Sequence, residues 1–193
     1  MGVKRRGLTR EIVVKAAAEM ADKAGDPQAV TLTALAQALN VRTPSLYNHI
    51  GGSRDLQEAM ALYGLTLLSE DLQKAIAGVV GREALMATAY AYRNYARRHP
   101  GIYPLTTQAP DPEDSQRSAV AAGLVQMFLL LLASMGIEGD DALHAVRGLR
   151  ALLHGFVSLE AAEGFKMALD REESFRRAAA TYLNGLSCER AAR

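Results

Sequence analysis

Apolar residues recur every three or four positions along most of the chain, which is the spacing of one face of an α-helix. The first such stretch covers residues 9–24. Thr9 has a hydroxyl that can cap the start of a helix, and Gly25 suits the left-handed residue that closes one. We therefore predict a first helix over this range, with the following apolar positions facing inward: Ile12, Ala16 and Met20, flanked by Val13, Ala17 and Ala24.

Two short helices are predicted next, separated by a tight turn. Thr31 is the expected cap of the first, and Asn40 ends it because asparagine tolerates positive φ. Thr43 is the expected cap of the second, with Pro44 at its first position, where the missing N–H costs nothing. The inward residues are predicted to be Leu32, Leu35, Ala36 and Leu39, then Leu46 and Ile50. Such a pair, with a polar and outward-facing second helix, is a helix-turn-helix.

Longer helices are predicted for the rest of the chain. The inward stripe of the first begins at Leu56 and Met60 and continues through Tyr63 and Leu67. The expected ranges are 53–77, 82–98, one short turn within 101–108, then 115–135, 140–163 and 172–186. The pattern predicts an all-α fold of about nine helices, divided into an N-terminal three-helix domain (1–55) and a helical C-terminal domain (56–193).

Composition adds two expectations. The chain has 193 residues, 49% of them hydrophobic, and a single cysteine, Cys188. No stretch resembles a secretory leader, and the longest apolar run, from Met127 to Met135, is shorter than the ~20 residues of a membrane span. These features predict a soluble, cytoplasmic protein with no membrane partner. Residues 1–55 carry a net charge of +3 and the remainder −2, which fits either a polyanion-binding end or a solvated basic face.

Catalytic motifs are not apparent in the sequence. The four histidines, His49, His99, His144 and His154, lack metal-ligand spacing, and neither a phosphate-binding glycine loop nor a nucleophile elbow occurs. We therefore expect no enzyme activity, no metal and no cofactor. His154 fits either a pocket contact or a core histidine bonded to the backbone.

The stretch "TLTALAQALNVRTPSLYNHIGGSRDL" resembles the TetR family of transcriptional repressors. Later segments, "AYAYRNYARRHPGIY" and "LRALLHGFVSLE", are similar to a His-Gly (WHG-like) branch of that family's C-terminal domains. Ile50 stands where the family usually has an aromatic residue, and Ser53 where it often has a phosphate-contacting lysine, for which the adjacent Arg54 can substitute. The matching positions in the first stretch are Leu35, Ala36, Val41, Leu46, Tyr47, His49 and Leu56.

The resemblance implies that the second short helix enters the major groove of DNA. Arg42 is then a reader of guanine or a phosphate contact, Pro44 suits a thymine methyl group, and Ser45 or Asn48 supplies a hydrogen bond to a base. Tyr47 and His49 are similar to phosphate contacts of the family. The tail "VKRRG" is expected along the backbone or in a minor groove. The predicted DNA-binding residues are Thr31, Thr33, Arg42, Thr43, Pro44, Ser45, Tyr47, Asn48, His49 and Arg54.

For the C-terminal domain, the resemblance implies a homodimer through the last two helices and an unknown small-molecule effector. The expected pocket residues, which could equally be plain core, are Met86, Tyr90, Tyr95, Tyr103, Met127, Phe128 and His154. The predicted function is a ligand-responsive dimeric repressor that binds a palindromic double-stranded DNA operator and is released by a small apolar effector. The alternative is a helical small-molecule or protein-binding module without specific DNA binding.

Overall fold

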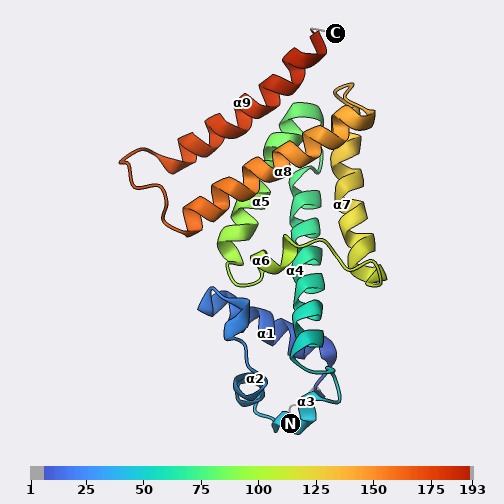
Figure 1. Ribbon diagram of the computed structural model, residues 1–193, viewed down its shortest axis with the longest axis vertical. Coiled ribbons are helices and arrows are strands. Elements are labelled where there is room, and N and C mark those ends of the chain that lie inside the picture. Colours follow the sequence, from blue (N-terminus) through green and yellow to red (C-terminus); the bar gives the residue numbers. More distant parts are fainter. Residues whose placement is uncertain (1–6, 192–193) are drawn as a thin grey trace. The chain divides into compact units, whose positions relative to one another are not determined.

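The computed structural model describes residues 7–191, and the regular structure in that range is helical throughout (Figure 1). The all-α prediction is therefore confirmed. Lys4, Arg5 and Arg6, which belong to the predicted DNA-contacting tail, lie outside the described residues. The elements are α1 (Arg10–Ala24), η1 (Pro27–Ala29), α2 (Leu32–Ala38), α3 (Thr43–Leu46), α4 (Ser53–Ala75), α5 (Gly81–Arg98), α6 (Tyr103–Thr106), α7 (Ser115–Ala133), α8 (Gly139–Ala161) and α9 (Arg171–Ala191).

The chain forms two compact units that divide α4 between them. The N-terminal unit extends to Leu67 and also contains Arg98–Arg117, and the second unit holds Leu68–Arg97 and the chain from Ser118 onward. The first half of α4 belongs with the short helices because Leu56 and Met60 are buried in their core. The predicted boundary between an N-terminal domain (1–55) and a C-terminal domain (56–193) concerns their functions, and it stays a prediction.

The core of the N-terminal unit is built from small and branched side chains of α1 to α4. Leu35 and Ala36 of α2 are buried, as predicted. On α1, the predicted flanking residues Val13 and Ala17 are buried. The prediction was wrong for Ile12, Ala16 and Met20, which are only half-buried, and for Ala24, which is exposed. Two apolar stripes lie side by side on this helix, and the tight packing decides which of them faces inward. The buried stripe of α1 consists of Val13, Val14, Ala17, Ala18 and Ala21.

The predicted helix starts and stops are mostly observed. The Thr9 hydroxyl accepts a hydrogen bond from the Ile12 N–H at 3.3 Å, and Asn40 ends α2 with φ 53°. Thr43, however, does not cap α3. That helix begins at Thr43, follows Arg42 and has no side-chain cap. Pro44 at the second position offers no N–H for a cap to bind, and the next N–H, of Ser45, already donates to the Arg42 carbonyl at 2.8 Å.

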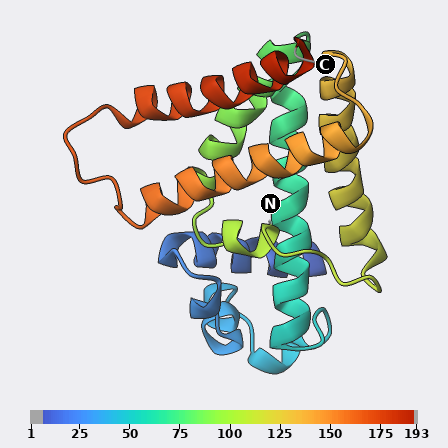
Figure 2. The ribbon, with the colours of Figure 1, turned by 45° about the horizontal axis from the view of Figure 1, so that its top comes forward.

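In the second unit, α8 and α9 lie side by side, joined by the loop at residues 162–170 (Figure 2). The Tyr182 hydroxyl donates to the Ala145 carbonyl at 2.8 Å. A Cβ atom at Gly148 would collide with the Tyr182 ring, so the glycine permits this close approach. Phe175, Ala179 and Leu183 of α9 are buried, and α8 buries Leu149, Leu153 and Val157.

A buried arginine connects α5 to α8 and α9. Arg93 is 2% exposed. Its Nε and Nη2 donate to the two carboxylate oxygens of Glu160 at 2.9 and 2.8 Å, and its Nη1 donates to Glu172 at 2.6 Å. The guanidinium also lies 4.8 Å from the Phe175 ring centroid. The bonds to Arg93 lower the pKa of Glu160, and those to Glu160 raise the pKa of Arg93.

Helix α7 is more apolar over its length than the sequence pattern suggested. Among the helices that the structure describes, it is the one long and apolar enough to cross a membrane by length and composition, with mean hydropathy 1.5 over 18 residues, 17% of them buried. The expectation that no apolar stretch reaches this length is corrected, because small residues from Ala119 to Gly123 extend the apolar run. Length and composition alone assign no membrane role to a helix.

Candidate DNA-binding surface

The segment from α3 to the start of α4 presents its polar residues outward. Leu46 is fully buried and Ile50 is 2% exposed, so these two residues anchor the segment on the core. Tyr47 is 57% exposed although it is a large aromatic residue. The predicted DNA-binding residues of this segment divide into exposed Arg42, Pro44, Tyr47 and Asn48, and half-buried Thr43, Ser45 and His49. An exposed and polar segment on two apolar anchors suits insertion into a groove.

The start of α2 offers a second exposed polar point. Thr31 is the N-cap of this helix, and its hydroxyl accepts a hydrogen bond from the Ala34 N–H at 3.2 Å. Thr33, in the first turn, is exposed as well. Backbone N–H groups and a hydroxyl at a helix start favour a phosphate oxygen, and the phosphate-binding role of both threonines stays a prediction.

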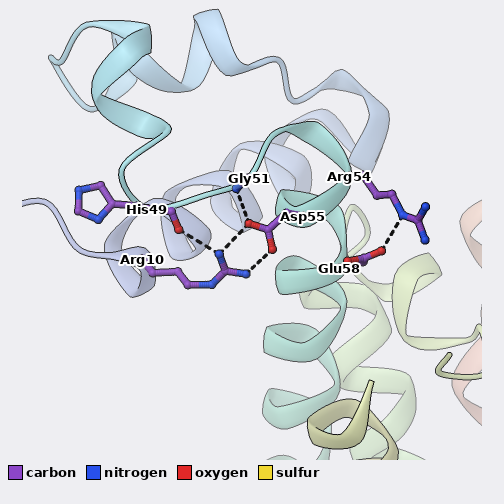
Figure 3. Close-up of polar contacts among 6 residues, drawn as sticks. All are labelled: Arg10, His49, Gly51, Arg54, Asp55 and Glu58. Carbon is purple, nitrogen blue, oxygen red and sulfur yellow. Dashed lines mark hydrogen bonds and ion pairs between the residues drawn. The ribbon is translucent and has the colours of Figure 1, made fainter. Parts of the chain in front are cut away.

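An ion pair that the sequence analysis did not identify fixes the segment against its neighbours (Figure 3). Arg10 of α1 donates to the Asp55 carboxylate through Nη2 at 2.6 Å and through Nη1 at 2.7 Å, and Nη1 also donates to the His49 carbonyl at 2.9 Å. The Gly51 N–H donates to the same carboxylate at 2.6 Å. The bond from Arg10 is the main cause that lowers the pKa of Asp55 to about 2. Helices α1 and α4 are thereby tied to the turn that follows α3.

The paired glycines between α3 and α4 have different roles. Gly52 has φ 122°, a conformation that residues with a side chain rarely adopt. Gly51 supplies the N–H that Asp55 accepts. The tight turn therefore requires a glycine at residue 52 in particular. It connects the recognition segment, residues 42–49, directly to α4.

Arg54, the predicted substitute for a phosphate-contacting lysine, points away from the Arg10–Asp55 ion pair. Its Nε donates to the Glu58 carboxylate at 2.9 Å, and Figure 3 shows it on the opposite side of α4 from Asp55. The side chain is 87% exposed. Because solvent screens such a pair strongly, a nearby phosphate can compete with Glu58 for the guanidinium.

The residues predicted to line an effector pocket are divided between the two units of the chain. Tyr103 belongs to the N-terminal unit and the other six to the second unit. Tyr95 is fully buried, whereas His154 is exposed. The Tyr90 ring packs edge-on against Phe175 at 5.5 Å. Met86, Met127 and Phe128 are half-buried. Their shared role as a pocket stays a prediction.

Comparison with known proteins identifies the family. Residues 85–182 match the family model described as the tetracyclin repressor-like C-terminal domain. The chain belongs to the TetR family. This assignment agrees with the helix-turn-helix at its N-terminus, and it makes the protein a transcriptional regulator.

Similar proteins extend the TetR-family match over most of the chain. The chain is 38% identical over 183 residues to the uncharacterized HTH-type transcriptional regulator YobS of Bacillus subtilis, covering 94% of each. It is 34% identical over 154 residues to the HTH-type transcriptional regulator Rv0681 of Mycobacterium tuberculosis, covering 79% of this chain and 70% of the relative.

Solved structures share the TetR fold at lower identity. A protein of unknown function from Rhodococcus sp. RHA1 has a TM-score of 0.80 at 23% identity, covering 97% of this chain and all of its own. A TetR transcriptional regulator from Streptomyces coelicolor has a TM-score of 0.73 at 20% identity, covering 94% and 99%. A TetR variant from Acinetobacter baumannii in complex with minocycline has a TM-score of 0.68 at 21% identity, covering 95% and 99%.

Proposed function

We propose that this TetR-family regulator is a dimeric repressor that binds a palindromic operator and is released by a small apolar effector. The observation that carries the DNA-binding part is the outward-facing segment from Arg42 to His49. Its apolar residues, Leu46 and Ile50, are buried, while Tyr47 and its polar neighbours face solvent. A segment that contributes so little to the core is suited to contact a partner.

The individual roles follow from chemistry and exposure. Arg42 reads a guanine or binds a phosphate, Pro44 contacts a thymine methyl group, and Ser45 or Asn48 bonds to a base edge. Tyr47 and His49 donate to phosphates. Phosphate contacts at the margins of the segment come from Thr31, Thr33, Thr43 and Arg54.

A dimer is proposed because one recognition segment reads too few base pairs. Two copies spaced about 34–36 Å apart would meet successive turns of the major groove. We assign the interface to α8 and α9, where α8 leaves Leu143 at 43% and Leu159 at 52% exposure. Exposed leucines on a helix that also packs on its own chain support a second contact.

The effector is proposed to be apolar because of the methionine and aromatic residues predicted to hold it. The relevant set is Met86, Tyr90, Tyr95, Tyr103, Met127, Phe128 and His154. The minocycline complex of a TetR variant from Acinetobacter baumannii supports an organic ligand. We also propose that the C-terminal domain belongs to the His-Gly branch, and that the protein is cytoplasmic and not an enzyme.

One observation favours the alternative of a helical binding module without specific DNA binding. Ser53 stands in place of the lysine, and Arg54, its substitute, is bound to Glu58. A binding measurement separates the two functions. Fluorescence anisotropy with a labelled random-sequence duplex should show affinity that falls steeply between ~50 and ~200 mM salt, because phosphate contacts release counterions. Binding that does not respond to salt would favour the module.

A further inference from the structure

The guanidinium of Arg54 is held toward the second turn of α4. Arg54 lies in the first turn of this helix, and its Nε donates to the Glu58 carboxylate at 2.9 Å. A residue four positions later lies about one turn, or roughly 5.4 Å, further along a helix. Glu58 therefore draws the guanidinium along α4, away from the turn at Gly51 that follows the recognition segment (Figure 3). A phosphate beside the recognition segment and the Glu58 carboxylate thus require different positions of the same side chain.

The surroundings of this ion pair carry an excess of negative charge. Arg54 and Glu58 lie in the wall of a polar groove within the N-terminal unit, together with the segment that connects α6 to α7. Three arginines line the groove, against six carboxylates, which are Asp26, Asp55, Glu58, Asp111, Glu113 and Asp114. The hydrogen bond to Glu58 is the main cause that raises the pKa of Arg54, and the charge of Asp111 adds to it. The groove wall therefore attracts the guanidinium and repels DNA phosphates.

Of the three arginines in this wall, Arg54 is the one open to an incoming phosphate. Its side chain is 87% exposed and that of Glu58 is 53% exposed, and exposed pairs at this spacing give little net attraction. Arg10 is held to Asp55 by two hydrogen bonds, and Arg117 is buried. A phosphate can therefore take Arg54 from its partner at a small cost in free energy.

We propose that Glu58 is an internal competitor of DNA for Arg54, so that it lowers the affinity of the protein for every duplex. This inference rests on the proposed DNA-binding function and on the phosphate contact of Arg54 within it. A phosphate that binds Arg54 displaces Glu58 and then lies near a carboxylate without its partner. Glu58 acts through Arg54, so it is a positioning residue. Because phosphate contacts carry no sequence information, the competition acts equally on preferred and scrambled sites.

Glu58→Gln tests this competition, since glutamine keeps the shape of the side chain and removes its charge. Fluorescence anisotropy of the full chain with a labelled random-sequence duplex should show about two- to fivefold tighter binding, because the proposed dimer carries two such pairs. The slope of log affinity against log salt should become steeper by up to about 0.9 for each subunit. Unchanged or weaker binding, or a gain confined to one duplex sequence, would overturn the proposal.

Two comparisons separate competition from a general effect of charge. Glu70→Gln breaks the matching pair with Lys74, four positions apart in the same helix at 3.4 Å, and should leave DNA binding unchanged. In an Arg54→Gln background, Glu58→Gln should lose most of its effect, because the guanidinium for which Glu58 competes is gone. A gain of equal size in that background, or an equal gain from Glu70→Gln, contradicts the competition.

The same titrations distinguish failure of this inference from failure of the proposed function. A wild type that binds no duplex contradicts the proposed function and this inference with it. A wild type that binds in a salt-dependent manner, and whose affinity Glu58→Gln does not raise, overturns the competition alone. Both exchanged side chains are more than half exposed, so the variants should keep the fold, and a thermal melt of each one checks this.

Discussion

Arg10 and Asp55, which lie 45 positions apart in the sequence, form a two-pronged ion pair at 2.6 and 2.7 Å. Through it, α1 holds both the start of α4 and the carbonyl of His49 at the end of the recognition segment. The arrangement links the position of the segment proposed to contact DNA to an ion pair between α1 and α4.

Asp55→Asn should destabilise the protein in a pH-dependent manner. The folded-state pKa of Asp55 is about 2, below its ordinary 3.8, so the stabilisation is fully present above pH ~4 and is lost as pH falls through 2. Both partners are partly exposed, and after allowance for solvent screening the loss should be about 1 kcal/mol near neutral pH. Urea denaturation across pH measures it.

Arg10→Lys serves as the control for this pair, because lysine keeps the positive charge but cannot donate the two parallel hydrogen bonds of the guanidinium. We expect a smaller loss of stability from it than from Asp55→Asn. Equal stability of wild type and Asp55→Asn at pH 7 would show that the pair does not stabilise the fold.

A second close contact joins α1 to the segment that follows α5. Asp22 of α1 accepts the N–H groups of Gly101 at 3.0 Å and Ile102 at 3.1 Å. A Cβ atom at Gly101 would collide with the backbone of Ala21. Gly101→Ala should therefore destabilise the N-terminal unit by about 2 kcal/mol or more, since a backbone atom cannot move aside as a side chain does.

Gly123→Ala is the matched control, because a Cβ at Gly123 of α7 meets nothing within 4 Å. It should be neutral or stabilising by up to about 1 kcal/mol, since alanine is the better helix former. In thermal melts, the melting temperature should fall for Gly101→Ala and should stay unchanged or rise for Gly123→Ala. A Gly101→Ala variant as stable as Gly123→Ala would contradict the packing described at Ala21.

The buried Arg93 should contribute far more to stability than an exposed ion pair of the same chemistry. Arg93→Met leaves Glu160, 12% exposed, without its partner, so a loss of about 3–5 kcal/mol is expected. Arg176→Met breaks the exposed pair with Glu173 and should change little. Guanidinium denaturation compares the two, and similar losses for both would exclude a special role for burial at Arg93.

Arg42→Ala and Tyr47→Phe should affect DNA binding in different ways. If Arg42 reads a base, its loss costs ~1–3 kcal/mol on the preferred site and relaxes sequence preference. Removal of the Tyr47 hydroxyl should weaken all duplexes alike. Anisotropy titrations on preferred and scrambled duplexes separate these outcomes, and equal losses on both duplexes for Arg42→Ala would make it a phosphate contact only.

Local signals in the sequence were enough to predict most helices and the outward face of the recognition segment. Capping residues such as Thr9 and Thr31, and the positive φ of Asn40, depend only on near neighbours. Contacts between distant positions left no such signal. The Arg10–Asp55 pair arises when helices 45 positions apart in the sequence meet. The α1 stripe was misassigned because two apolar faces compete there.

The most direct test of the account is selection of bound duplexes from a random-sequence pool by the full-length protein, followed by sequencing. We predict enrichment of a palindrome whose half-sites lie about 34–36 Å apart, with preference at the bases facing Arg42 lost in Arg42→Ala. A pool that stays random after repeated rounds, with a wild-type protein that is folded by its thermal melt, would contradict the proposed function.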